Sequence, residues 1–266
     1  HDHSCDTFIF LKGAPEKILE MCTYQRSLND DQPLDKNYWL ERIEELAGYG
    51  QRVLAFAFKP ANHKQEELAF SDLENDLIML GMVGLIDPPR EEAIEAVDIC
   101  KQAGIRVKMI TGDHGATARA IAQQLKLVNT DDVLTGTELE QMSEEKLRQR
   151  VLDVDIYARV NPEHKLCLVR LLQEHGLIVA MTGDGVNDAP ALKRADVGTA
   201  MGHNGTEAAK EASEMVLADD NFASITHAVE EGRTVYDNLK KAILFILPTN
   251  GGEALIILAA IAFGFH

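Results

Sequence analysis

The stretch Met181-Thr-Gly-Asp-Gly-Val-Asn-Asp188 follows an apolar run, Leu177–Met181, that predicts a buried strand. The predicted strand is followed by a glycine-rich turn that carries two carboxylates, Asp184 and Asp188. In open parallel α/β folds such turns lie at the carboxyl edge of the sheet, where ligands bind. Carboxylates on a tight turn suit Mg²⁺, which takes one or two protein oxygens together with phosphate. The stretch therefore predicts a parallel sheet with a Mg²⁺ site at Asp184 and Asp188.

Repeated strand–helix units extend from residue 77 towards this turn. Apolar runs predict strands at 105–110 and 155–160, and helical spacing predicts helices at 91–103 and 162–175. Glycines follow both helices at positions where a helix would stop. Strands alternating with helices of this length indicate an α/β fold, with a parallel sheet covered by helices on both faces.

The two ends of the chain differ from this pattern. Residues 1 to about 80 hold short apolar runs, Thr7–Leu11 and Val53–Phe58, and a polar surface loop in the 30s that leads into a helix at about 38–49. Near the carboxyl end, helices are expected at 222–231 and 234–242, followed by an apolar run to residue 265. At about 20 residues such a run can cross a bilayer, and its length favours this over a buried core helix. The abrupt start and the lone hydrophobic end predict a fragment.

Composition narrows the choice of partners. The chain has 266 residues and a net charge of −17, which argues against nucleic acid, since phosphate backbones attract a basic surface. No charged-then-apolar signal segment opens the chain. The cysteines are far apart and form no CxxC pair, so we expect reduced, mostly buried thiols in a cytosolic compartment: Cys5, Cys22, Cys100 and Cys167.

A similar strand-to-turn motif occurs earlier in the chain, Met109-Ile-Thr-Gly-Asp113. The hydroxyl of Thr111 and the amide of Gly112 can hydrogen-bond phosphoryl oxygens at a strand end. The alternative is a plain helix N-cap by Thr111 or Asp113. Between the two turns, Lys165 stands in the first turn of a helix, where it could neutralise a phosphoryl group; the alternative is a solvated surface lysine.

A threonine, a lysine and a GDGxxD turn, each at a strand end in this order, resemble the haloacid-dehalogenase-like phosphotransferases. In that family an aspartate attacks phosphorus and Mg²⁺ bridges the oxygens. The motifs also resemble P-type cation-transporting ATPases, in order and over nearly the whole chain: Lys12-Gly-Ala-Pro-Glu16, Asp87-Pro-Pro-Arg90, Met109-Ile-Thr-Gly-Asp113 and Thr182-Gly-Asp-Gly-Val-Asn-Asp-Ala-Pro190.

The resemblance implies three regions. Residues 1–85 would be part of an α+β nucleotide-binding domain, 86–232 a Rossmann-like phosphorylation domain of the haloacid-dehalogenase type, and 233–266 the stalk and the start of the fifth membrane helix. The parent protein would couple ATP hydrolysis, through an aspartyl-phosphate, to cation transport. It would be an integral protein of the plasma membrane with this head in the cytoplasm. Its partners would be ATP, the cation, the membrane and the remainder of the pump chain.

The resemblance also implies roles for single residues. Lys12 and Gly13 would lie beside the adenine and phosphates of ATP, Arg52 would reach the phosphate chain, and Asp87 would contact the nucleotide or its ribose. Around the transferred phosphoryl group, the implied roles are the γ-phosphate loop for Thr111, Gly112 and Asp113, charge neutralisation for Lys165, the Mg²⁺ ligand for Asp184, and hydrogen bonding for Asn187 and Asp188.

One motif of the family is missing. The nucleophile string Asp-Lys-Thr-Gly-Thr does not occur, and the similar string Leu134-Thr-Gly-Thr137 lacks its Asp-Lys. In the family the nucleophile precedes the first residue of this chain, so truncation explains its absence most simply, and the chain alone is expected to be inactive. No GxxxxGK[ST] loop is present, which removes a P-loop ATPase as a rival.

The apolar tail carries a polar interruption, Pro248-Thr-Asn-Gly-Gly-Glu253. A carboxylate at membrane depth usually marks an ion path, and a loosened backbone beside it would expose carbonyls. Asn250 and Glu253 share a helix face and resemble the Asn-x-x-Glu pair that binds cation in calcium and sodium/potassium pumps. The alternative is a polar kink that binds nothing.

Two other classes of function stay open. One is a nucleotide-binding module that binds ATP without turnover. The other is a haloacid-dehalogenase-type phosphatase, which would need a nucleophilic Asp-x-Asp at the end of a first strand. Asp153-Val-Asp155 is such a string, but it precedes its strand and follows the Thr111 motif, which is the wrong order.

Overall fold

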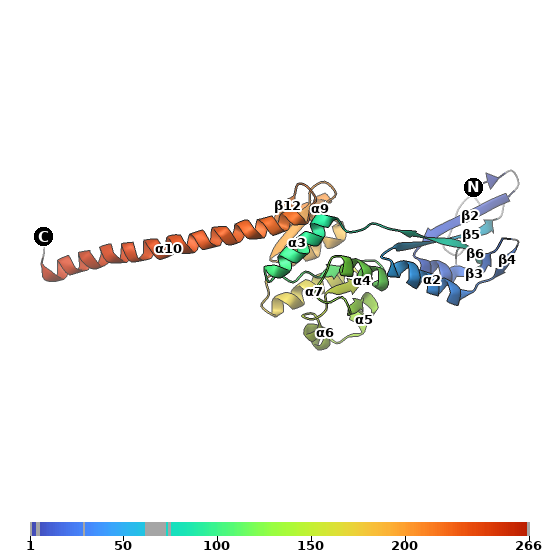
Figure 1. Cartoon of the computed structure of the whole chain (residues 1–266), viewed down its shortest axis with the longest axis horizontal. Coiled ribbons are helices and arrows are strands. Elements are labelled where there is room, and N and C mark those ends of the chain that lie inside the picture. The colour runs from blue at the N-terminus through green and yellow to red at the C-terminus, as the bar shows by residue number, and fades with distance from the viewer. Residues whose placement is uncertain (1, 4–5, 29, 62–72, 74–75, 265–266) are drawn as a thin grey trace.

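The computed structural model describes residues 2–3, 6–28, 30–61, 73 and 76–264. Figure 1 shows three parts along one axis: an amino-terminal sheet with its helices, a central α/β part, and a long helix that projects away from both. The amino terminus and the carboxyl end of the helix lie at opposite extremes of the molecule.

The amino-terminal part is a six-stranded sheet in the order β1-β2-β5-β6-β3-β4. Its strands are β1 (Asp2–His3), β2 (Asp6–Gly13), β3 (Cys22–Arg26), β4 (Asp31–Pro33), β5 (Arg52–Ala61) and β6 (Leu77–Leu85). The pairs are antiparallel except for β3 with β6. Two helices, α1 (Pro15–Met21) and α2 (Lys36–Gly48), pack their apolar side chains with residues of β5 and β6 to form the core. This arrangement confirms a unit that mixes helices with a mainly antiparallel sheet, and it confirms the helix expected near residue 38.

The surface loop expected in the 30s was wrong in part, because β4 lies there. Strand β4 pairs with β3, and Arg26 Nε and Nη2 donate to the Asp31 carboxylate at 2.5 and 3.1 Å. Asp and Pro have low strand propensity, so local sequence predicts a loop. An edge position tolerates proline, and tertiary pairing decides the outcome.

The central part alternates strands and helices, which confirms the predicted parallel α/β class. Its strands are β7 (Met109–Ile110), β8 (Val133–Thr135), β9 (Ile156–Ala158), β10 (Ala180–Gly183), β11 (Val197–Met201) and β12 (Met215–Leu217). Its helices are α3 (Glu91–Gln102), α4 (Gly115–Gln124), α5 (Gly136–Gln141), α6 (Glu144–Arg150), α7 (Pro162–Glu174), α8 (Ala189–Arg194) and α9 (Glu207–Glu211).

The strands fall into two three-stranded parallel sheets, β7-β9-β8 and β10-β11-β12, where the sequence suggested one. Strands β7 and β10 are therefore edge strands. Both are shorter than the predicted 105–110 and 177–181, because a segment with no neighbour on one side has only half the ladder to hold it in the strand conformation.

Helix α7 joins the two sheets. Leu168 and Leu171 pack in the cluster beside β8 and β9, and Val169 packs with Met181 and Ala200 of the second sheet. A third cluster holds α3 and α4 against β9. Asn161 caps α7 by accepting from the His164 amide at 2.9 Å, so the helix begins at a fixed point close to both sheet edges.

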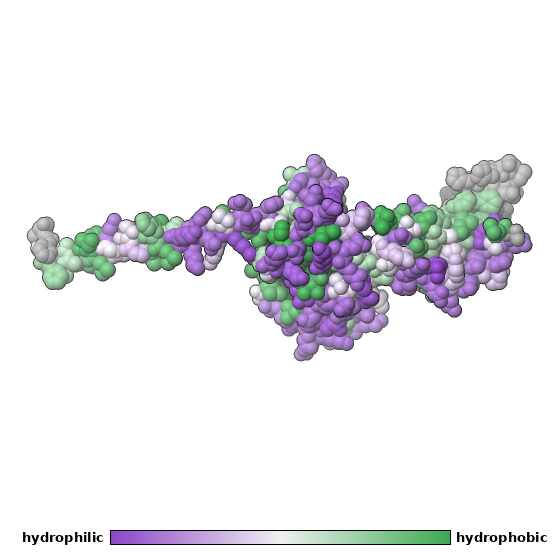
Figure 2. Space-filling model, viewed as in Figure 1, coloured by the Kyte–Doolittle hydropathy of each residue, from purple (hydrophilic) through white to green (hydrophobic). Residues whose placement is uncertain are grey.

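One continuous helix, α10 (Ala223–Phe263), replaces the two helices and the interrupted apolar run that the sequence predicted. Gly232 and Pro248 both lie inside it. A proline has no backbone N–H and so removes one hydrogen bond from the helix. Helices in apolar segments tolerate this loss because the other backbone hydrogen bonds remain. By length and composition α10 could cross a membrane, and its most apolar window is not buried against the rest of the chain. Figure 2 shows apolar residues along its distal half.

The cysteines behave as expected where the structure describes them. Cys22 and Cys100 are buried, Cys167 is half-buried, and Cys5 lies outside the described residues. Burial raises the pKa of the Cys22 thiol to about 11 and also raises the pKa of Cys100. These two thiols are therefore protonated at neutral pH.

A buried carboxylate holds the amino end of β9 in place. Asp155 is fully buried; one oxygen meets Arg106 Nε at 2.6 Å and Lys108 Nζ at 3.0 Å, and the other accepts from the Asn129 amide at 2.9 Å. Burial lowers the pKa of Lys108, and the Asp155 carboxylate opposes that shift. Asp155 thus ties together the segments that lead into β7 and β9.

Replacing Asp155 with Ala should lower the free energy of unfolding by about 3 kcal/mol or more, because two cations lose a buried partner. Urea denaturation followed by circular dichroism measures this. Asp153→Ala is the matched control, since its side chain is exposed. Equal losses in the two variants would contradict a specific role for Asp155.

Candidate functional site

The carboxylate turn after β10 folds back on itself. Asp188 ends a short 3₁₀ turn, Val186–Asp188, and its Oδ2 accepts from the amides of Asp184 and Gly185 at 3.2 and 3.1 Å. Its Oδ1 lies 2.5 Å from Lys165 Nζ, which comes from the first turns of α7. Asp188 is buried, with 5% of its surface exposed. The lysine and the carboxylate turn that the sequence placed together are therefore in direct contact.

Gly183 makes this fold-back possible. A Cβ on Gly183 would lie 2.6 Å from the Cβ of Asp188, closer than two carbons can approach. Any side chain there would push Asp188 away from Lys165. Gly185 is different, because the nearest atom to a Cβ there would be at 3.6 Å, an ordinary contact.

Asp184 keeps its carboxylate exposed and makes no side-chain hydrogen bond within the described part of the chain. Asp188, by contrast, has both oxygens occupied by Lys165 and the two amides. Asn187 is exposed on the same turn. No group of three or more His, Cys, Asp or Glu side chains among the described residues could hold a metal ion. A single exposed carboxylate still suits Mg²⁺, which keeps waters and takes its other oxygens from phosphate.

The Thr111 turn is also closed by its own side chains. Thr111 Oγ1 donates to Asp113 Oδ2 at 3.2 Å, and the Asp113 amide donates to Thr111 Oγ1 at 3.1 Å. Neither Thr111 nor Asp113 caps helix α4. The helix begins at Gly115 and is capped by His114, whose Nδ1 accepts from the Ala116 amide at 3.3 Å. The plain N-cap alternative for Thr111 and Asp113 is therefore wrong, and Gly112 is exposed between them.

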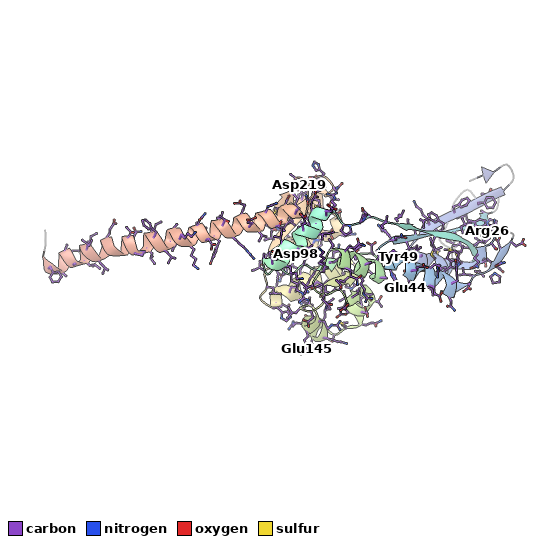
Figure 3. All side chains as sticks on the ribbon, in the orientation of Figure 1. Arg26, Glu44, Tyr49, Asp98, Glu145 and Asp219 are labelled. Atoms are coloured by element: carbon purple, nitrogen blue, oxygen red, sulfur yellow. The ribbon has the colours of Figure 1, made fainter. Side chains whose placement is uncertain are left out.

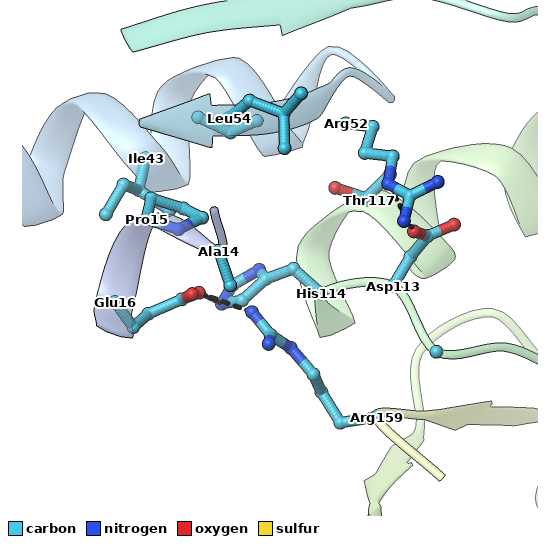
Figure 4. Close-up of a pocket in the computed structure, with 12 residues that line it drawn as sticks. Ala14, Pro15, Glu16, Ile43, Arg52, Leu54, Asp113, His114, Thr117 and Arg159 are labelled. Carbon is cyan, nitrogen blue, oxygen red and sulfur yellow. Dashed lines mark hydrogen bonds and ion pairs between the residues drawn. The ribbon is translucent and has the colours of Figure 1, made fainter. Parts of the chain in front are cut away.

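A cavity lies between the amino-terminal and central parts (Figure 4). It brings together three of the predicted residues, Arg52, Gly112 and Asp113, with Arg52 Nε 3.5 Å from Asp113 Oδ1. Thr117 fixes the two parts to each other, since its Oγ1 donates to the Gln51 carbonyl at 3.0 Å.

Sequence reasoning missed three charged or titratable residues that line this cavity: Glu16, His114 and Arg159. Glu16 ends the Lys12-Gly-Ala-Pro-Glu16 motif quoted above, and Arg159 stands six residues before Lys165, so nearness to predicted site residues was the available signal.

The other predicted nucleotide contacts do not line this cavity. Lys12 is exposed on β2, Gly13 is half-buried beside Ile18, and Asp87 is exposed in the segment between β6 and α3. Their proximity to a nucleotide stays a prediction. Asn250 and Glu253 are both exposed on α10, far along the helix from the central part.

Two family models match the chain. One, described as the cytoplasmic domain N of P-type ATPases, matches residues 1–92, and one for haloacid dehalogenase-like hydrolases matches residues 168–229. A cation-transporting ATPase of Synechocystis is 52% identical over 95% of the chain, and a calcium-transporting ATPase of Bacillus cereus is 46% identical over 99% of it.

The chain belongs to the P-type ATPase family. A calcium-transporting ATPase of Bacillus subtilis, 45% identical over 95% of the chain, adds a third relative. The chain spans 28–30% of the length of these relatives. In this P-type ATPase chain the hydrolase match begins within α7 and includes the whole carboxylate turn, while the domain N match covers the amino-terminal sheet.

Gly183→Ala should destabilise the chain by about 1–3 kcal/mol and separate Asp188 from Lys165, because the added methyl group overpacks the turn. Denaturant midpoints measure the loss. Gly185→Ala is the control and should stay near wild type. If the two variants lose the same stability, close approach at Gly183 is not the cause.

Proposed function

We propose that this chain is the part of a cation pump that binds Mg-ATP and stabilises the phosphoryl group during its transfer to an aspartate elsewhere in the pump chain. The observation that carries the proposal is the Lys165–Asp188 contact at the carboxyl end of β10, with the exposed carboxylate of Asp184 on the same turn. Phosphoryl transfer needs positioning and charge neutralisation more than covalent chemistry from many residues.

Each residue has a part in this proposal. Asp184 would ligate Mg²⁺, which when bound neutralises phosphoryl oxygens, and Asp188 would hold Lys165 and the turn in position. The Lys165 ammonium would stabilise charge that builds on the phosphoryl oxygens. Thr111 and Gly112 would donate to the γ-phosphate, with Asp113 fixing the Thr111 hydroxyl. Asn187 would hydrogen-bond the phosphoryl group, and Arg52 would contact the phosphate chain. The nucleotide contacts would come from Lys12, Gly13 and Asp87.

The two open sheet edges suggest how the rest of the pump supplies its nucleophile. Among the described residues, strand β7, which leads to Thr111, and strand β10, which leads to Asp184, each lack a neighbour on one side. A further parallel strand that paired with both would complete one continuous sheet. Its carboxyl end would then bring an aspartate between Thr111 and Asp184, since parallel strands end at the same edge.

The membrane part of the proposal rests on α10. The helix would cross the plasma membrane, with the head in the cytoplasm, and Asn250 and Glu253 would bind the transported cation from one helix face. Two of the three relatives described above are named calcium-transporting, which favours a divalent cation.

The phosphatase alternative loses its candidate nucleophile. Asp155, the second aspartate of the Asp153-Val-Asp155 string, is fully buried against Arg106 and Lys108, at the end of β9 opposite to the carboxyl edge. Asp155 cannot reach a substrate there, and Asp153, although exposed, precedes β9 at the same end, away from the edge where parallel α/β sheets bind ligands. A nucleotide-binding module without turnover remains the description that fits this chain when it is separated from the rest of the pump.

Isothermal titration of the detergent-solubilised chain with Mg-ATP tests nucleotide binding. Arg52→Ala and Lys12→Ala should each weaken binding about tenfold or more, because each removes a charge-assisted contact. Lys17→Ala, an exposed cation on α1 paired with Glu20, is the control and should bind as wild type does. No acid-stable phosphoprotein should form. Robust phosphorylation of the isolated chain would mean that another carboxylate here is the nucleophile.

The full-length pump tests transfer and transport. Asp184→Asn should reduce phosphorylation from ATP at least a hundredfold, because the Mg²⁺ ligand loses its charge. Glu253→Gln should instead abolish only the cation dependence of phosphorylation. Both are measured with radioactive ATP in membrane vesicles.

Asp98→Asn, on the exposed surface of α3 (Figure 3), is the control for the loss of one negative charge. Normal phosphoenzyme levels in Asp184→Asn would contradict the metal role. Unchanged cation dependence in Glu253→Gln would contradict the ion path.

A further inference from the structure

Ion pairs cross the boundary between the amino-terminal and central parts. Glu16 Oε1, on α1, lies 2.7 Å from Arg159 Nη2, which follows β9. His114 Nε2, at the start of α4, lies 3.7 Å from the same Glu16 oxygen and 3.5 Å from Glu44 Oε1 of α2. Figure 4 shows Glu16 and Arg159 directed towards each other across the cavity. These contacts join segments that the backbone connects only through the stretch between β6 and α3.

The backbone positions Arg159 for this contact. Arg159 has φ +53°, in the left-handed region that non-glycine residues seldom adopt. Its amide donates to the Asp113 carbonyl at 3.2 Å, and its own carbonyl lies where a side chain on Gly136 would be. The Leu134-Thr-Gly-Thr137 string therefore has a structural use: its glycine admits the Arg159 carbonyl. Strained backbone of this kind persists where its surroundings enforce it, and it gathers at functional sites.

Both guanidinium groups in the cavity already face a carboxylate of the protein. Arg159 pairs with Glu16, and Arg52 lies 3.5 Å from Asp113. Glu16 has a second oxygen, Oε2, that is buried without a hydrogen-bond partner among the described residues. Guanidinium groups bind phosphate as readily as carboxylate, so these carboxylates occupy places that a polyphosphate would take.

We propose that Glu16 is an internal competitor for the phosphate chain of the nucleotide. In the nucleotide-free protein it holds Arg159 and closes the amino-terminal part against the central part. A polyphosphate that enters the cavity takes Arg159 from Glu16 and replaces this ion pair with a bridge between Arg159 and Arg52. The second half of the proposal rests on the proposed nucleotide site, and the first half does not.

The contact has a strength suited to reversible closure. Glu16 and Arg159 side chains are 31% and 38% exposed, so solvent screens their attraction. An ion pair at this exposure shifts an equilibrium by about twofold to fivefold. A polyphosphate carries several charges and can pair with Arg159 and Arg52 together, so it displaces a single carboxylate.

Hydrogen–deuterium exchange on the whole chain in detergent tests the closure without nucleotide. Glu16→Gln should speed amide exchange about twofold to fivefold at residues 43–51, the carboxyl end of α2 and the turn after it, which contain neither Glu16 nor Arg159. The charge-swapped pair Glu16→Arg with Arg159→Glu should restore wild-type exchange. Glu20→Gln is the matched control, because it removes the same charge from an exposed position on the same helix.

Calorimetric titration with inorganic tripolyphosphate and with Mg-ATP tests the competition. Glu16→Gln should bind both about twofold to fivefold more tightly than wild type and Glu20→Gln, and adding Arg159→Gln should remove the gain. Unchanged or weaker binding in Glu16→Gln, with wild type still binding Mg-ATP, overturns the competition and leaves the proposed function standing. No Mg-ATP binding by wild type overturns both. Exchange at residues 43–51 that is the same in Glu16→Gln and Glu20→Gln overturns the closure.

Discussion

The contact between Lys165 and Asp188 is the constraint on which the central part depends. Lys165 stands on α7, the helix whose two sides pack into the cores beside both parallel sheets, and Asp188 ends the turn after β10. The contact requires Gly183 to lack a side chain and Asn161 to start α7 at the right place. Packing, capping and backbone geometry thus converge on one pair of charged atoms. The pair leaves Asp184 as the carboxylate that solvent can reach.

The sequence predicted those parts of the fold that depend on local signals. Turns with Thr-Gly-Asp after apolar runs gave the carboxyl ends of β7 and β10, and Asn161-Pro162 gave the start of α7, because capping and turn chemistry act within a few residues. Strand extent was predicted less well. Residues 105–108 and 177–179 have strand-like sequences, but a strand exists only where another chain segment pairs with it.

The cavity between the two parts could not be predicted in the same way. Glu16 and Arg159 are 143 positions apart. In each of the two stretches the predicted site residue is a lysine, Lys12 near Glu16 and Lys165 near Arg159. Neither the left-handed backbone of Arg159 nor the space at Gly136 has a signal in single-residue propensities. Arg52 and Asp113 were assigned by resemblance, and the structure adds that they contact each other.

Continuity of α10 has a mechanical consequence. A helix of 41 residues is about 60 Å long, and Asn250 lies about 40 Å from its first turn. Nearly three turns after its start, the helix is still tied to the central part, where Arg233 Nη2 donates to the Ala103 carbonyl at the end of α3 at 2.8 Å. A rigid rod held at one end magnifies small rotations. A tilt of about 10° at Arg233 would move Asn250, which lies about 26 Å beyond it, sideways by about 4.5 Å, close to the pitch of one helical turn. The helix therefore acts as a lever arm between the central part and its own distal half.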